Sequence, residues 1–311
     1  MANKYILLAD DIEDQTSSGR SRSHLLRDLA AEFARRLKEP LWVLYANKAK
    51  TSDISDNLKN LIETVEKRSE KLVEKELSHY PIEFKINSVS GHPSDCIIKE
   101  ARDTDSVEMV VVGAHHKKGL KKTILGSVSE EVVRNSLVPV LILGPEALKQ
   151  KYELPLDEPL RILFLSDLSG ASGPAEKVAI DLTKKLKAQL TVCHSVGHQI
   201  FHLKEMLSSL STVPSDSLLK NIRRGAESSL TRKVKQIQNK NIDVERLLIR
   251  DERNIEDVIV EMADDSFDLI VMGTHTRNKV LTAFIGSSAR NLILRSPIPV
   301  MVVRSAPIKM Y

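Results

Sequence analysis

An internal repeat is the feature of this sequence that most limits its fold. Three short segments, Val111–His115, Ile124–Ser127 and Val138–Val140, recur as Val271–His275, Phe284–Ser287 and Ile298–Val300. The offset is constant, because 273 − 113, 286 − 126 and 299 − 139 all equal 160. Near the start of the chain, Ile6–Asp11 matches Ile162–Asp167 at an offset of 156. The chain is therefore a duplication, and the four-residue difference indicates insertions in loops.

The length fits two copies of one domain. The 311 residues suffice for two hydrophobic cores of about 150 residues each. We expect a first domain over residues 1–145, a linker over 146–160 and a second domain over 161–306. The stretch around the linker is polar and holds three prolines, Pro145, Pro155 and Pro159.

Composition and charge exclude several classes of protein. Apolar residues make up 41% and charged residues 28%, which is typical of a folded globular chain. The formal net charge of +4 is small, so it predicts neither a nucleic-acid nor a membrane partner. Apolar runs are too short for a signal peptide or a membrane span. With only two distant cysteines, Cys96 and Cys193, we expect a cytoplasmic protein with reduced, inert thiols.

Short apolar runs predict five strands in each copy, and the last two of each copy read as strands buried on both faces. The predicted strands are Tyr5–Ala9, Leu41–Ala46, Ile82–Val89, Glu108–Val112 and Val138–Leu143 in copy one, and Arg161–Leu165, Leu190–Ser195, Val244–Ile249, Leu269–Met272 and Ile298–Val303 in copy two. Amphipathic helical patterns separate them. Strands that alternate with helices predict an α/β fold: two tandem, open, five-stranded parallel sheets with helices on both faces, a Rossmann-like arrangement.

Two long helices carry apolar stripes at helical spacing, which we interpret as core-facing. The stripes are Leu58, Leu61, Ile62, Val65, Leu72 and Val73 in copy one, and Leu219, Ile222, Ala226, Leu230, Val234 and Ile237 in copy two.

Ligands of open parallel sheets bind beyond the carboxyl ends of the strands. In copy one, Asp11, Gly91 and Gly113 follow three of the predicted strands, and Gly126–Ser129 opens the last helix. A glycine followed by free backbone N–H groups at a helix start favours an anion, and Ser127 and Ser129 add hydroxyl donors. A Gly-Ser pair is also an ordinary helix cap that needs no ligand.

This arrangement resembles the universal stress protein family, over nearly the whole chain and twice. The family's nucleotide-binding pattern is Gly, two residues, Gly, nine residues, Gly, then Ser or Thr. Copy one has Gly113, Gly126 and Ser127 at this spacing, and copy two has Gly273, Gly286 and Ser287. The resemblance implies a fold like that of the adenine-nucleotide α-hydrolases. It also implies that Asp11 or Asp167 contacts adenine, and that the backbone of Ala46 or Ser195 does so too.

Both copies depart from that pattern. The middle glycine is replaced by His116 in copy one and by Thr276 in copy two. His116, beside Lys117 and Lys118, keeps a way to donate to a phosphate. In copy two, Arg253 stands near the position of Gly91, and Ala289 replaces Ser129. Copy one is therefore the better candidate for binding a nucleotide.

The basic run His115–Lys122 is interpreted either as a flap over the phosphates or as a solvated loop. His194, His198 and His202 are four residues apart, but His194 ends a predicted strand, so we expect no metal site there. Asp10 and Asp11 are neighbours on a strand and point to opposite faces, which argues against a catalytic carboxylate pair. We find no P-loop, nucleophile elbow or zinc-protease motif.

Three functions remain open on the sequence. The first is a stress-response regulator that binds ATP, with Mg²⁺, or another adenine nucleotide, and signals to an unknown protein partner. The second is a scaffold that binds partner proteins and no nucleotide. The third is a slow, Mg²⁺-dependent ATPase that uses Asp11 and Glu13. The resemblance further implies pairing through the last strands, Val138–Leu143 and Ile298–Val303, within one chain or between two chains.

Overall fold

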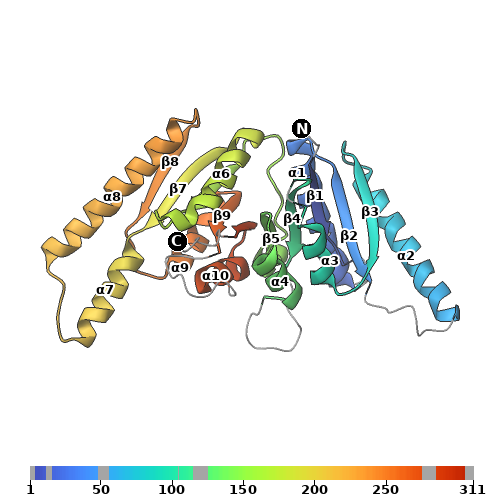
Figure 1. The fold of residues 1–311 in the computed structure, drawn as a ribbon, viewed down its shortest axis with the longest axis horizontal. Helices are drawn as coiled ribbons and strands as arrows, with labels where there is room; N and C mark the ends of the chain where they lie inside the picture. The colour runs from blue at the N-terminus through green and yellow to red at the C-terminus, as the bar shows by residue number, and fades with distance from the viewer. Residues whose placement is uncertain are drawn as a thin grey trace. The chain divides into compact units, whose positions relative to one another are not determined.

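The computed structural model describes residues 4–11, 16–47, 56–103, 105–114, 125–274 and 285–304. The chain divides into two compact units, which we call unit 1 (Met1–Leu154) and unit 2 (Pro155–Tyr311). Figure 1 shows that each unit has a central sheet flanked by helices.

Unit 1 alternates strands and helices along the chain. Its elements are β1 (Tyr5–Ala9), α1 (Ser17–Leu37), β2 (Leu41–Asn47), α2 (Asp56–Leu77), β3 (Phe84–Ser90), α3 (Pro93–Glu100), β4 (Val107–Gly113), α4 (Ser127–Asn135), β5 (Val140–Leu143) and α5 (Pro145–Gln150). The strand order within the unit is β3-β2-β1-β4-β5, and every pair is parallel.

Unit 2 repeats this plan. Its elements are β6 (Arg161–Leu165), the 3₁₀ turn η2 (Gly170–Ser172), α6 (Gly173–Leu186), β7 (Gln189–Ser195), α7 (Gly197–Ser209), α8 (Asp216–Gln238), β8 (Val244–Ile249), α9 (Ile255–Ser266), β9 (Leu269–Gly273), α10 (Ser287–Arg295) and β10 (Val300–Val303). The order β8-β7-β6-β9-β10 is again entirely parallel.

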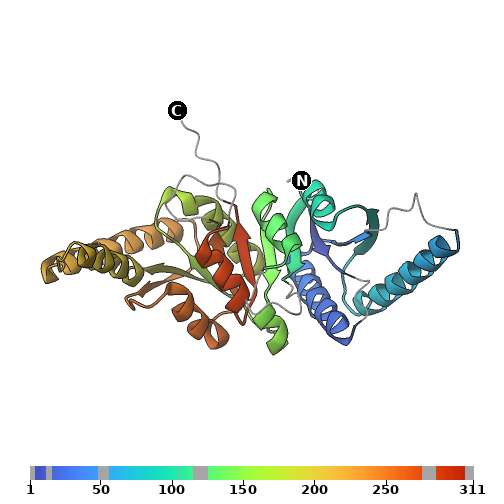
Figure 2. The same cartoon turned by 90° about the horizontal axis from the view of Figure 1, so that it is seen from below.

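Helices cover both faces of each sheet. In unit 1, α1 packs against α2, and α3 packs against α4. Figure 2 shows these two pairs on opposite sides of the sheet, with α6 and α8 opposite α9 and α10 in unit 2. The predicted α/β class, two five-stranded parallel sheets with helices on both faces, is confirmed.

The central strands form the core because they are apolar on both faces. Six consecutive residues of β4 (Val107–Val112) are buried, as are all four of β5 and four of the five in β9. β-branched side chains that are covered by helices on both sides satisfy this pattern. The predicted strands end within two residues of the observed ones, which is the usual uncertainty of an element boundary.

Two details of the sequence analysis are corrected. Leu72 does not join the buried stripe of α2, because its side chain is 42% exposed. Among the described side chains of α2, the buried row consists of Ser69, Val73 and Leu77, which are spaced by four, and Leu72 lies about 100° away around the helix. The side chains of the other predicted stripe residues, Leu58, Leu61, Ile62 and Val65, lie outside the described part of the structure. The segment predicted as a linker begins with the helix α5, where Ala147 is buried. In unit 2, four of the six residues of the predicted stripe are buried, namely Leu219, Leu230, Val234 and Ile237, and Ile222 and Ala226 are half-buried.

Strand register shows where the two copies differ in length. Ile6 corresponds to Ile162, an offset of 156. Their strand partners Leu41 and Leu190 differ by 149, and the next partners, Phe84 and Val244, differ by 160. Copy two is thus seven residues shorter before its second strand, matching 14 residues in α6 against 21 in α1. It is eleven residues longer before its third strand, where α7 is found.

A buried carboxylate in α1 gives a test of this fold. Glu32 accepts hydrogen bonds from Arg35 Nε (2.8 Å) and Arg36 Nε (2.7 Å). Burial raises the pKa of Glu32, but the two guanidinium groups outweigh it, so the net pKa lies below its usual 4.5. A lowered pKa stabilises the fold above the unfolded value, and that contribution is lost as pH falls through the folded value.

We therefore expect Glu32→Gln to lower the free energy of unfolding by about 1 to 2 kcal/mol at pH 7. The difference from the wild type should shrink as the pH falls below the unfolded pKa. Urea unfolding followed by circular dichroism at pH 7 and pH 3.5 measures both effects. Glu74→Gln, on the exposed side of α2, is the control and should change little. A deficit that stays constant with pH would contradict the ion-pair account.

Candidate functional site

The parallel register brings the predicted site of unit 1 to one edge of the sheet. Ala9 at the end of β1 pairs with Leu44 of β2 and with Val112 of β4. Asp11, Ala46 and Gly113 lie one or two residues beyond these partners. Their backbones therefore emerge side by side at the carboxyl ends of three adjacent strands, where open α/β sheets bind ligands.

The two adjacent aspartates have separate roles, as the strand geometry predicts. The Asp10 carboxylate is fully buried and accepts a hydrogen bond from Arg27 Nε at 2.6 Å. Burial raises the pKa of Asp10, and the guanidinium of Arg27 opposes that shift. Asp11 is exposed, and none of the described residues forms a hydrogen bond or ion pair with its carboxylate. Asp10 thus anchors α1, which leaves Asp11 available at the site.

The turn after β3 requires a glycine. Gly91 has φ of +147°, and a Cβ there would lie 2.9 Å from Cys96 Sγ. The positive φ therefore disfavours any L-residue, and a Cβ would also require the Cys96 side chain to move. The next residue, His92, is the N-cap of α3, and its Nδ1 lies 2.7 Å from Ser94 Oγ. Glycine keeps the backbone here open to close approach.

The start of α4 is held against the end of β4 by a hydrogen bond that the sequence analysis missed. Ser129 Oγ is buried and donates to the carbonyl oxygen of Gly113 at 2.8 Å. Its proton is already used, so Ser129 positions α4 and is not the free donor that we expected. The N-cap, Gly126, has no side-chain cap, and Ser127 is exposed. The N–H groups of this first turn therefore remain available for an anion.

Some predicted residues lie outside the described part of the chain. These are His116 with its basic run, Thr276, and the acidic residues Glu13 and Asp14. Their predicted roles stay predictions.

In unit 2 the same sheet edge is built from Asp167, Ser195 and Gly273, but Asp167 is already engaged. Leu165 pairs with Cys193 and Met272, so the three positions come together as they do in unit 1. The Asp167 carboxylate accepts from Ser169 N (2.9 Å) and from Ser169 Oγ (2.7 Å). This local turn leads into η2. The carboxylate that corresponds to Asp11 is therefore occupied by its own chain.

In unit 2, the space between the segments that follow β7 and β8, which we call the strand gap, is also closed. Gly197, the first residue of α7, is so close to the next loop that a Cβ would lie 1.8 Å from the carbonyl oxygen of Asp251. Beneath it, His194 Nδ1 lies 2.8 Å from the carbonyl oxygen of Ser166, and Gln199 of α7 lies 3.3 Å from His194 Nε2. α7 thus fastens the carboxyl ends of β6, β7 and β8 together.

Arg253, which stands near the position that Gly91 has in unit 1, is held by carboxylates. Its guanidinium donates to Asp251 Oδ2 at 2.9 Å and to both oxygens of Glu261 at 2.8 and 3.0 Å. An anionic ligand at this position would have to compete with two carboxylates. The start of α10 keeps the uncapped glycine, Gly286, and Ser287 is exposed there.

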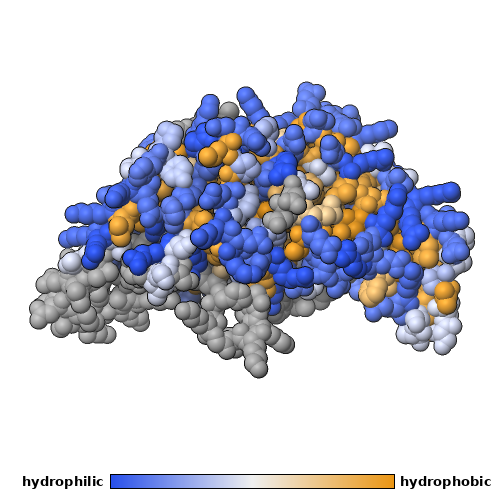
Figure 3. All heavy atoms as spheres, turned by 180° about the vertical axis from the view of Figure 1, so that it is seen from behind, coloured by the Kyte–Doolittle hydropathy of each residue, from blue (hydrophilic) through white to orange (hydrophobic). Residues whose placement is uncertain are grey.

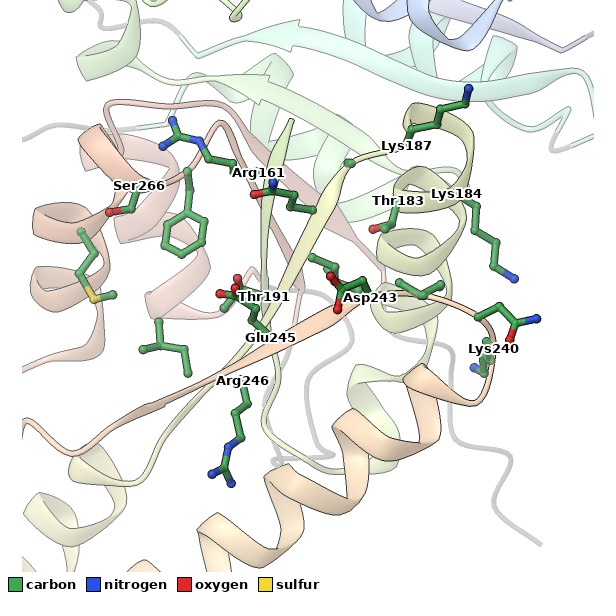
Figure 4. A pocket seen from close by; sticks show the side chains of 18 residues that line it. Arg161, Thr183, Lys184, Lys187, Thr191, Lys240, Asp243, Glu245, Arg246 and Ser266 are labelled. Carbon is green, nitrogen blue, oxygen red and sulfur yellow. The ribbon is translucent and has the colours of Figure 1, made fainter. Parts of the chain in front are cut away.

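A separate hollow of about 810 Å³ lies at the opposite edge of the sheet in unit 2. Figure 4 shows Thr191, Asp243 and Glu245 toward its middle, while Lys184 and Lys240 extend away from them. It opens at the amino ends of β7 and β8, whereas ligand sites of parallel sheets lie at the carboxyl ends. We therefore place the candidate site at the other edge, in spite of the size of this hollow.

Other chemistry in the described residues is limited. Both cysteines are free, and burial raises the pKa of Cys193 to about 12. Among the described residues, no group of three or more His, Cys, Asp or Glu side chains is arranged to hold a metal ion. None of the described helices is both long enough and apolar enough to cross a bilayer.

Sequence reasoning missed the two contacts that separate the copies, the Ser129–Gly113 hydrogen bond and the Gly197 packing. One signal was present: the pairing of Ser129 with Ala289 in the repeat shows that only copy one has a hydroxyl there. Gly197, two residues after the end of β7, was a second signal, since a glycine often marks a close backbone approach.

Comparison with known proteins agrees with this fold. The model of the universal stress protein family matches residues 4–144 and 160–304. A universal stress protein from Archaeoglobus fulgidus has a similar structure, with 21% identity and a TM-score of 0.67 over 98% of this chain and all of that one.

Two sequence relatives are also similar. The universal stress protein MJ0577 of Methanocaldococcus jannaschii is 34% identical over 29% of this chain, and Rv2005c of Mycobacterium tuberculosis is 25% identical over 65% of it. The matches span 55% and 64% of those relatives' own lengths.

The closed gap in unit 2 predicts the effect of a small substitution. Gly197→Ala should destabilise the protein by about 3 kcal/mol, because the methyl group meets backbone atoms that cannot rotate away. Urea unfolding measures the loss. Gly225→Ala in α8 is the matched control, since a Cβ there meets nothing within 4 Å; it should be neutral or stabilise by up to about 1 kcal/mol. Equal midpoints for the two variants would show that the gap is open.

Proposed function

Because the chain belongs to the universal stress protein family, with two copies of the family's domain, we propose that unit 1 binds an adenine nucleotide and acts as a stress-response regulator. The observation that carries the proposal is the contrast between two equivalent carboxylates. The Asp11 carboxylate is exposed and accepts no hydrogen bond from a described residue, whereas the Asp167 carboxylate is held by Ser169. Asp11 can therefore accept a hydrogen bond from a ligand without first breaking one.

The remaining groups of unit 1 support a nucleotide by their chemistry. The uncapped first turn of α4 supplies N–H groups and the positive end of a helix dipole, which favour phosphates. Gly91 lets the backbone approach a ribose or phosphate closely. The backbone of Ala46 lies at the same edge as Asp11 and is suited to contact adenine. ATP is the ligand to test first, with Mg²⁺ as its usual counterion.

A second function is favoured for unit 2. The chain itself engages the carboxylate of Asp167 and the guanidinium of Arg253, and α7 closes the strand gap. Unit 2 therefore fits a scaffold that binds a partner protein without a nucleotide. This combines two of the hypotheses from the sequence within one chain. The slow ATPase is left without a specific observation in its favour. Pairing through the last strands stays a prediction.

The test is calorimetric titration of the whole protein with Mg²⁺-ATP. We expect Asp11→Ala to weaken binding about tenfold or more, because a hydrogen bond to a charged group contributes about 1.5 to 3 kcal/mol. Asp167→Ala is the matched control and should leave the affinity unchanged. Absence of heat at millimolar ATP, or equal losses in both variants, would contradict the proposal.

A second variant distinguishes the space that the phosphates need at the start of α4 from the backbone conformation of Gly126. Gly126 has φ of −60° and ψ of 145°, which any residue can adopt. Gly126→Val should therefore fold normally, as circular dichroism would show, but lose ATP affinity because the side chain fills the phosphate position. Unchanged affinity for ATP would show that the phosphates do not bind at the start of α4.

A further inference from the structure

The end of the α7–α8 hairpin exposes an unusual amount of apolar surface. The described part of the chain has eight large hydrophobic side chains that are exposed, and five of them lie between residues 201 and 218. Four form what we call the hairpin tip: Met206 (56% exposed), Leu210 (67%), Val213 (87%) and Leu218 (42%). Single exposed apolar residues are ordinary, but a group of them marks a contact surface.

The hairpin is fixed at its base, so the tip is not a loosely packed core. Val196, Ile200 and Leu219 form a buried cluster that joins α7 to α8. Lys204 of α7 donates to both oxygens of Glu252, at 2.9 and 2.8 Å, in the loop after β8. The inward face of α7 is therefore already packed, and the tip side chains are left outside it.

The tip is a convex turn of the chain. α7 ends at Ser209, Ser211 has a left-handed φ of 53°, and Thr212 N donates back to the carbonyl oxygen of Leu207. Leu210 and Val213, the two most exposed residues of the tip, lie in this turn. In Figure 3, orange and pale residues gather at the lower right, at the end where α7 and α8 meet.

The charges beside the tip are mostly positive, although the exposed acidic residues Glu205 and Asp216 also lie next to it. α8 carries six Lys and Arg residues against two acidic ones, Asp216 and Glu227. Close to the tip, Lys220 and Arg224 are exposed, and neither forms an ion pair with a described carboxylate. Two copies of this hairpin would repel each other. The complementary surface is therefore anionic outside and apolar beneath, as in a bilayer that contains acidic lipids.

We propose that the hairpin tip inserts into the interface of an anionic membrane, with Leu210 and Val213 entering the headgroup region and Lys220 and Arg224 contacting lipid phosphates. This goes beyond the nucleotide site of unit 1. It also departs from the sequence-based expectation of no membrane partner, which rested on net charge and on the absence of a long apolar run. Neither the net charge nor the absence of a long apolar run can reveal a short turn with exposed apolar side chains.

Sedimentation with vesicles tests the proposal on the whole protein. Vesicles of equal parts phosphatidylcholine and phosphatidylglycerol should bind the protein at low salt, and pure phosphatidylcholine vesicles should bind it at least tenfold more weakly. Binding should fall as salt is raised, because the attraction of Lys and Arg to the surface is screened.

Two pairs of variants separate the apolar and charged contributions. Leu210→Glu/Val213→Glu should lose at least tenfold in binding, whereas Leu156→Glu, at a residue that is 75% exposed outside the hairpin, should bind normally. Lys220→Glu/Arg224→Glu should also lose about tenfold, and Lys177→Glu/Lys184→Glu on α6 is its control. All four positions on the hairpin are exposed, so these variants should keep the thermal midpoint of the wild type.

No binding to phosphatidylglycerol vesicles at low salt would overturn the proposal. Binding that the tip variants leave unchanged would overturn it as well. A third result, binding to an acidic peptide that depends on Leu210 and Val213 without any vesicle binding, would assign the tip to an acidic protein partner and reject the membrane. ATP binding by unit 1 is measured separately and affects none of these outcomes.

Discussion

Parallel pairing in register is the constraint on which the rest of this structure depends. When β1 pairs with both β2 and β4 in parallel, Ala9 lies opposite Leu44 and Val112, and the residues that follow all three must emerge at one edge. The return to the next strand then needs a helix across a face, which buries the apolar strands on both sides. One pairing rule thus creates both the core and a polar edge suited to a ligand.

The same edge has diverged in the two copies through a few local contacts. In unit 1, a serine hydroxyl holds α4 to the end of β4, and a carboxylate stays exposed. In unit 2, the corresponding carboxylate caps its own turn, and the longer segment before β8 includes the helix α7, whose first residue packs against the next loop. Neither change disturbs the sheet, since both occur after the strands have ended. Contacts at this edge can therefore differ between the two copies while the core of each is retained.

Much of the fold could be predicted from the sequence, because it depends on periodicity and repetition. The strands, their parallel direction and the equivalence of Asp11 with Asp167 follow from apolar runs, the alternation with helices and nearly constant offsets, whereas the order of the strands within each sheet does not. The state of each site could not be predicted in this way. Whether Asp167 is free depends on the rotamer of Ser169 two residues away, and whether the strand gap is open depends on how closely Gly197 approaches Asp251. Leu72 shows the same limit on a helix, where a shift of one residue changes the exposed face.

The central claim is that only the first copy keeps an open nucleotide site, and stoichiometry tests it most directly. Native mass spectrometry of the intact chain with Mg²⁺-ATP counts the bound nucleotides, and photo-crosslinking with an azido-adenine analogue locates them. The account predicts one nucleotide per chain, with labelled peptides confined to residues 1–154. Two nucleotides per chain, or labelled peptides from unit 2, would contradict it.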